Sequence, residues 1–217
     1  MLFSGAILKS KFNTPIIPVE GNHDVGNGEG DYDKLTKRFL FYANNAFDAE
    51  IEKPFYYKEI GGYYFIVISS EWYNGNNSHG FSDEQLIWLE SLVKKASGEG
   101  KPVFVFGHYT FWEVRSESDS LYNILTKYDH VFYFHGHNHA HFDEFSLSYF
   151  AKTAIINLPK WDNIPGEDSS LNSDTGAGVL VEVYDDKVVV RGRDFITDRW
   201  LPERTYSLVP GIPTIVW

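Results

Sequence analysis

Short apolar runs alternate with longer amphipathic segments along most of the chain. Residues 63–69 are continuously apolar, which is typical of a strand that is covered on both faces. Residues 102–107 and 131–135 are also predicted to form strands. Residues 15–20 are predicted to form another short buried strand that runs into a Gly-Asn turn. Apolar side chains recur at helical spacing in residues 31–45, and more weakly in residues 121–128.

The clearest predicted helix begins after residue 82. Ser82 is a good N-cap, and Gln85 stands where the second residue of a capping box belongs. Phe81 and Leu86 occupy the staple positions on either side of the cap. The predicted buried stripe consists of Leu86, Leu89, Leu92, Val93 and Ala96.

The C-terminal third follows a different pattern. Residues 153–158, 177–184 and 187–195 are predicted strands, and the last two form a hairpin around residues 185–186. An α/β part followed by a β-rich part, from about residue 150, indicates two packed sheets with helices outside. We therefore expect one domain over residues 1–217.

Composition excludes several kinds of chemistry. The chain has no cysteine, so disulfides, thiolate metal sites and cysteine nucleophiles are excluded. The net charge of −11 argues against nucleic-acid binding through a basic face. It does not argue against a phosphate substrate, because a metal centre adds positive charge that the sequence does not count. No apolar run reaches the ~18 residues of a membrane helix, and residues 1–9 do not resemble a signal peptide.

Three short segments place His or Asn directly after a glycine at the end of an apolar strand. They are Gly21-Asn22-His23-Asp24, Gly107-His108 and Gly136-His137-Asn138-His139. Functional groups of α/β proteins gather at the carboxyl ends of strands, and glycine lets the backbone approach a metal or phosphate closely. Imidazole nitrogens and an amide oxygen suit zinc, manganese or iron. We expect these side chains to converge on a metal centre.

In order and spacing, these segments resemble the last three motifs of the calcineurin-like metallophosphoesterases. The resemblance covers about residues 1–158, and it implies an α/β/β/α sandwich of two mixed sheets. It also implies hydrolysis of a phosphomonoester or phosphodiester at two divalent or trivalent metal ions (Mn, Zn or Fe). Residues 192–207 resemble the end of secreted bacterial relatives, a slight indication that a full-length parent is secreted or periplasmic.

The resemblance assigns a role to each candidate residue. Asn22, His108 and His137 correspond to ligands of one metal, and His139 corresponds to a ligand of the other. His23 corresponds to the residue that hydrogen-bonds the substrate phosphate or protonates the leaving group, with Asp24 orienting its ring.

Two motifs of that family do not precede Asn22: an Asp-x-His strand end and a Gly-Asp-x-x-Asp segment. We therefore expect the fold to lack its first strands, residues 1–12 to be the end of a helix, and the metal site and activity to be impaired. Two alternatives stay open, namely a non-catalytic binding scaffold of the same fold and the product of a broken gene. The sequence gives no indication of the oligomeric state.

Overall fold

The structure is a computed structural model that describes residues 14–25, 31–73, 79–113, 119–159, 176–195 and 197–209. Its helices are α2 (Tyr32–Phe47), α3 (Asp83–Gly98), α5 (Asp119–Lys127) and the 3-10 turn η2 (Glu144–Ser146). A large sheet contains β1 (Tyr56–Ile60), β2 (Tyr63–Val67), β5 (Val103–Phe106), β6 (Val131–His135), β7 (Leu147–Phe150) and β8 (Thr153–Asn157). A second sheet contains β9 (Ala177–Val183), β10 (Lys187–Asp194) and β11 (Arg199–Ser207), and β3 (Trp72–Tyr73) pairs with β4 (His79–Gly80).

The six-stranded sheet is mixed, with the order β1-β2-β5-β6-β8-β7. Strands β2, β5, β6 and β8 are parallel, and the two outer strands run antiparallel to their neighbours. The carboxyl ends of four central strands therefore meet at one edge, where the candidate site residues follow.

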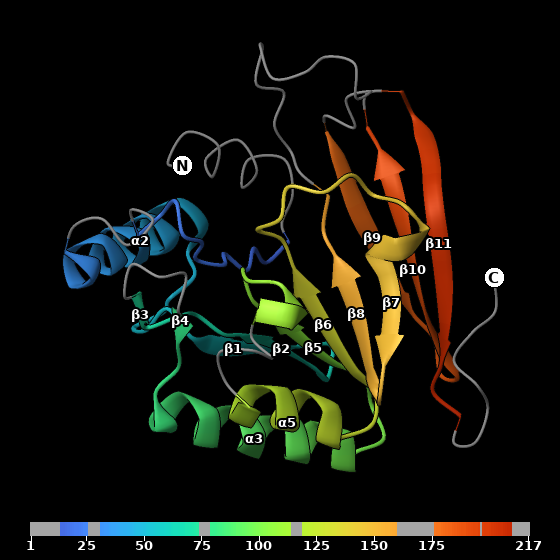
Figure 1. The fold of residues 1–217 in the computed structure, drawn as a ribbon, viewed down its shortest axis with the longest axis horizontal. Coiled ribbons are helices and arrows are strands. Elements are labelled where there is room, and N and C mark those ends of the chain that lie inside the picture. Colours follow the sequence, from blue (N-terminus) through green and yellow to red (C-terminus); the bar gives the residue numbers. More distant parts are fainter. Residues whose placement is uncertain are drawn as a thin grey trace.

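The large sheet is covered on both faces (Figure 1). Helices α3 and α5 pack on one face, and the second sheet packs on the other. Strand β5 contacts both neighbouring layers. Val103 and Val105 face the helices, whereas Phe104 and Phe106 face the second sheet. Between the sheets, neighbouring phenylalanine rings lie with centroids 5.0–6.3 Å apart: Phe65, Phe104, Phe106 and Phe134.

The predicted strand at residues 15–20 is wrong, because the structure assigns no regular element there. Pro15 and Pro18 lack a backbone N–H, which removes ladder donors from the segment. It is held by side chains instead, since the Tyr56 hydroxyl donates to the Pro18 carbonyl oxygen at 2.6 Å. Ile17 and Val19 pack against the apolar cluster beneath α2.

The cap of α3 differs from the predicted capping box. Ser82 Oγ accepts from the Gln85 backbone N–H as expected, at 3.2 Å. The Gln85 side chain, however, is fully buried and binds the Ser69 backbone and the Glu71 carboxylate. Glu71 Oε2 accepts from Ser82 N at 2.7 Å and so completes the cap in place of Gln85.

Most other predicted elements are confirmed, with shifts of a few residues at their ends. Five strands are not among the predicted elements: β1, β3, β4, β7 and β11. Strand β11 is an edge strand that is exposed mainly in its first half and contains Pro202, so it lacks the apolar alternation that identifies a buried strand.

The predicted fold class is confirmed, because a mixed six-stranded sheet with helices on one face packs its other face against a second sheet. Among the described residues, the pairs of the second sheet are all antiparallel. Residues 1–12 lie outside the described residues, and the absence of the first strands stays a prediction. In the described part of the chain, no helix has the length and apolar character needed to cross a membrane.

Candidate metal centre

The predicted ligands lie in loops at the carboxyl edge of the large sheet. His108 follows β5 and His137 follows β6, and the two loops are joined by a hydrogen bond from Gly136 N to the His108 carbonyl oxygen at 3.1 Å. Asn22 comes from the turn at residues 22–25. Arg38 of α2 supports that turn, because its Nη2 donates to the Asp24 carbonyl oxygen at 3.0 Å.

Three predicted ligands are brought together around one atom, His108 Nε2. Asn22 Oδ1 lies 2.7 Å from it, and His137 Nδ1 lies 3.1 Å from it. Side chains separated by 86 and 29 positions in the sequence thus present an amide oxygen and two ring nitrogens to the same small volume.

The environment keeps this imidazole uncharged. Burial, followed by the neighbouring imidazoles of His137 and His23, lowers the pKa of His108 to about 4. A neutral imidazole retains the lone pair that a metal ligand requires. His108 is therefore ready to bind a cation at neutral pH without first losing a proton.

Two glycines allow the close approach of these loops. A Cβ atom on Gly21 would lie 2.9 Å from His108 Nδ1, so the turn that carries Asn22 touches the histidine ring directly. A Cβ on Gly107 would lie 2.7 Å from the Tyr133 hydroxyl and 3.1 Å from Ile68 Cγ1. Gly21 is thus explained by packing against His108, and Gly107 by packing against Tyr133 and Ile68.

The third motif is unusual in its backbone. His137 has a φ of 70° and His139 has a φ of 49°, both in the left-handed region. Residues other than glycine seldom adopt this region, and such outliers concentrate at functional sites. The two left-handed residues turn the loop sharply just after β6.

His23 and His139 form a second pair beside these donors. Both are exposed, and their ring centroids lie 6.4 Å apart. The predicted contact between Asp24 and His23 is not present among the hydrogen bonds of the described residues. Asp24 Oδ2 accepts from Gly21 N at 3.0 Å instead, because the tight turn carries its carboxylate back over that N–H.

Sequence reasoning missed Glu113, whose Oε1 lies 3.3 Å from His137 Nε2. Its other oxygen, Oε2, accepts from Thr110 N at 2.8 Å, while Thr110 Oγ1 accepts from Glu113 N at 3.2 Å. This reciprocal pair is a capping box, and the Thr-x-x-Glu spacing directly after Gly107-His108 was the available signal. The Tyr109 ring packs against His137 with a centroid separation of 4.9 Å.

The donor set fits one metal ion better than two. Two ligands bound at ~2.1 Å lie about 3.0–3.4 Å apart at octahedral and tetrahedral angles. The observed 2.7 and 3.1 Å are close to that range. For a second ion, the predicted ligands supply only His139, and within the described ranges no group of three or more His, Asp or Glu side chains is arranged to hold a metal.

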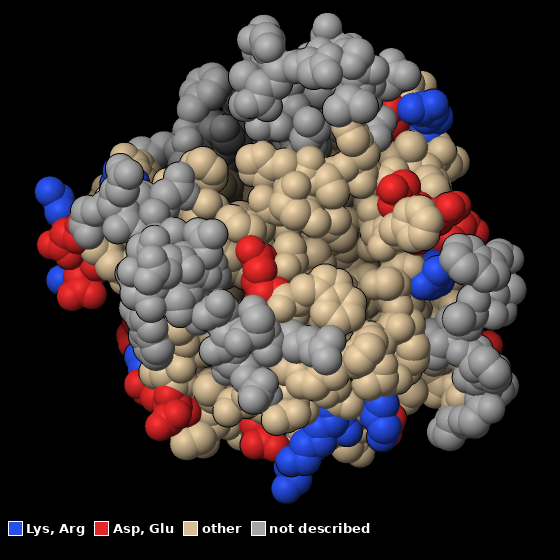
Figure 2. Space-filling model, viewed as in Figure 1, with Lys and Arg blue, Asp and Glu red and all other residues tan. Residues whose placement is uncertain are grey.

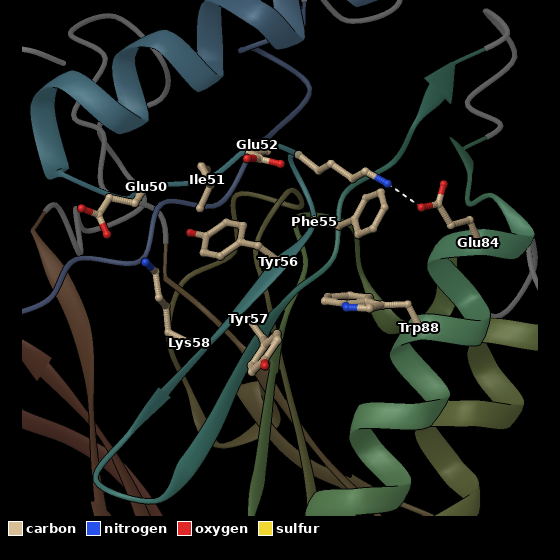
Figure 3. A pocket seen from close by; sticks show the side chains of 10 residues that line it. Glu50, Ile51, Glu52, Phe55, Tyr56, Tyr57, Lys58, Glu84 and Trp88 are labelled. Atoms are coloured by element: carbon tan, nitrogen blue, oxygen red, sulfur yellow. Dashed lines mark hydrogen bonds and ion pairs between the residues drawn. The ribbon is translucent and has the colours of Figure 1, made fainter.

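On the face in Figure 2 the described Lys and Arg side chains lie near the rim, and the described residues in the middle are mostly uncharged. A separate pocket of about 350 Å³ lies by β1 and the start of α3, with Phe55, Tyr57 and Trp88 in its wall (Figure 3). No predicted metal ligand lines it, and Lys53 in its wall is already paired with Glu84.

Comparison with known proteins gives three results. The family profile described as calcineurin-like phosphoesterase matches residues 3–141, which include every predicted site residue. The chain is 30% identical over 91 residues to the uncharacterized protein YvnB of Bacillus subtilis (strain 168), an alignment covering 39% of this chain and only 6% of that protein. A solved dimetal phosphatase from Danio rerio is similar at 16% identity and a TM-score of 0.42, over 60% of this chain and 40% of that one.

Proposed function

Because the chain belongs to the calcineurin-like phosphoesterase family, we propose that it functions in the metal-dependent hydrolysis of a phosphate ester. The observation that carries this proposal is the convergence of Asn22 Oδ1, His108 Nε2 and His137 Nδ1 at the carboxyl edge of the sheet. An amide oxygen and two imidazoles suit Mn, Zn or Fe. The substrate is a phosphomonoester or a phosphodiester.

The geometry supports the following proposed roles. Asn22, His108 and His137 hold one metal ion, which when bound supplies positive charge to the phosphoryl oxygens. His23 is exposed beside this donor set, so it can hydrogen-bond a substrate phosphate or give a proton to the leaving oxygen. Asp24 has a revised role, since its carboxylate closes the turn that presents Asn22 and His23.

A second metal ion has less support. His139 is its proposed ligand, and its ring lies beside that of His23. Among the described residues, no group of three or more His, Asp or Glu side chains is arranged to hold a metal ion. We therefore expect slow turnover by the 217-residue chain, because one of the two charges that stabilise the phosphoryl group is weakly held.

A non-catalytic binding scaffold is the second candidate. It would keep the metal donors and would have no use for a proton donor at their side. The exposed His23 next to His139 therefore favours the enzyme.

The test is hydrolysis of p-nitrophenyl phosphate and bis-p-nitrophenyl phosphate by the full chain with added Mn²⁺. Wild type is compared with His108→Ala and His23→Ala. His130→Asn is the matched control, because His130 precedes β6 at the opposite end of that strand and Asn tolerates its left-handed backbone.

We expect slow, Mn²⁺-dependent turnover that His108→Ala and His23→Ala abolish and His130→Asn preserves. Mn²⁺ binding without turnover would favour the scaffold. Turnover that persists with a chelator, or that survives His108→Ala, would reject the metal-dependent mechanism.

A further inference from the structure

Glu113 joins the backbone after β5 to the metal ligand after β6. One carboxylate oxygen, Oε2, is held by the Thr110 N–H at 2.8 Å. The other, Oε1, lies 3.3 Å from His137 Nε2. The hydrogen bond of Oε2 to Thr110 therefore restricts where Oε1 lies beside His137.

We propose that Glu113 is a positioning residue that fixes the ring of His137 with its proton on Nε2 and its lone pair on Nδ1. This inference rests on the proposed function, because it assigns Nδ1 as the metal-binding atom. Nδ1 is the nitrogen that faces the other donors, 3.1 Å from His108 Nε2. A carboxylate accepts but does not donate, so its position beside Nε2 favours the tautomer that carries a proton there.

Glu113 is held in place by contacts with residues close to it in the sequence. The capping box ties the carboxylate to Thr110, only two residues after His108. Tyr109 lies between them in sequence, is buried, and packs its ring against His137. His137 is thus bounded by Glu113 at one nitrogen, by His108 at the other and by an aromatic ring beside it.

The position of Glu113 matters for metal binding because His137 sits on a left-handed backbone at the end of a loop. Its side chain is partly exposed, at 26%, so packing alone does not fix the ring. A carboxylate hydrogen-bonded to the outer nitrogen of a metal-binding histidine fixes its tautomer and raises its basicity, and losing such a partner costs ~10–100-fold in metal affinity.

Four variants of the full chain separate this role from a purely structural one. Glu113→Ala removes both contacts of the carboxylate, and Glu113→Gln keeps a neutral acceptor for Nε2–H. Thr110→Ala removes the hydroxyl of the cap but leaves the carboxylate. Glu90→Gln is the control, because Glu90 forms an ion pair with Lys127 between α3 and α5.

The first readout is the affinity for Mn²⁺ by isothermal titration calorimetry. Glu113→Ala should weaken binding ~10–100-fold, and Glu113→Gln should weaken it less. Thr110→Ala should lower the melting temperature while weakening binding far less than Glu113→Ala, and Glu90→Gln should leave the affinity unchanged. Equal affinity of folded Glu113→Ala and wild type, or equal losses in Thr110→Ala and Glu113→Ala, would overturn the inference.

The second readout needs no metal. In long-range ¹⁵N–¹H NMR spectra of the metal-free chain, His137 should show the Nε2–H tautomer in wild type and a mixture of tautomers in Glu113→Ala. A wild-type spectrum with the proton on Nδ1, or an identical tautomer in both proteins, would overturn the inference. If the tautomer shifts as expected but wild type binds no Mn²⁺, the positioning by Glu113 stands and the proposed metal-dependent function fails.

Discussion

Replacing Gly107 by alanine tests how the end of β5 positions His108. The added Cβ would lie 2.7 Å from the hydroxyl of Tyr133, and real Cβ atoms do not approach other atoms so closely. Tyr133 is fully buried, and its hydroxyl donates to the Tyr109 carbonyl oxygen at 2.7 Å. The methyl group must therefore displace a side chain that has no free space around it.

The expected cost has two parts. Displacing the Tyr133 hydroxyl leaves a buried donor and a buried carbonyl poorly paired, at about 1–3 kcal/mol. Overpacking a filled core costs a further ~1–3 kcal/mol. Gly107→Ala should thus lower the free energy of unfolding by about 2–6 kcal/mol, enough to threaten a domain with a typical margin of ~5–15 kcal/mol.

A double-mutant cycle shows whether this contact is the cause. Tyr133→Phe removes the hydroxyl that the new methyl group meets, and by itself should cost about 0.5–1.5 kcal/mol for the lost hydrogen bond. The double variant should then be at least ~1 kcal/mol more stable than the two single effects predict together. The measurement is urea-induced unfolding followed by tyrosine and tryptophan fluorescence.

Gly136→Ala is the matched control, because a Cβ at Gly136 would meet no atom within 4 Å. It should change the free energy of unfolding by less than ~0.5 kcal/mol. If Gly107→Ala is as stable as Gly136→Ala, or if the effects of the substitutions at Gly107 and Tyr133 are additive, the contact between the new methyl group and the Tyr133 hydroxyl is not the cause.

Three further predictions follow from the same geometry. Gly21→Ala should weaken Mn²⁺ binding by calorimetry, because its Cβ would lie 2.9 Å from His108 Nδ1; an affinity like that of Gly136→Ala would contradict this. His139→Gly should be more stable to urea than His139→Ala by about 1 kcal/mol, because residue 139 has a φ of 49°; equal stabilities would show that the backbone is unstrained. Gln85→Ala should lower the free energy of unfolding by about 3 kcal/mol, because it removes two buried hydrogen bonds and one that is partly buried; a loss below ~1 kcal/mol would show that water replaces them.

The sequence was most informative for strands in which burial determines nearly every residue. The apolar runs that became β2, β5 and β6 are covered on both faces, so nearly every side chain in them is apolar. His108 and His137 were predicted as ligands for a related reason, since each follows a glycine at the end of such a run, where parallel strands bring their loops together. Asn22 also follows a glycine, but the segment before it forms no strand.

Other features depended on contacts between distant residues. Gln85 matches a capping box in sequence, but Ser69 and Glu71 offer its buried side chain better partners. Asp24 was expected to orient His23, yet the turn directs its carboxylate to Gly21 N. Such choices between competing hydrogen-bond partners depend on the folded geometry, so the local pattern did not reveal them.

The central claim is that Asn22, His108 and His137 hold one metal ion. The most direct measurement is the anomalous difference map of crystals soaked in Mn²⁺. We expect a peak ~2.1 Å from Asn22 Oδ1, His108 Nε2 and His137 Nδ1. A map with no peak at the carboxyl edge of the sheet, or with its strongest peak more than about 4 Å from these three atoms, twice a ligand distance, would contradict it.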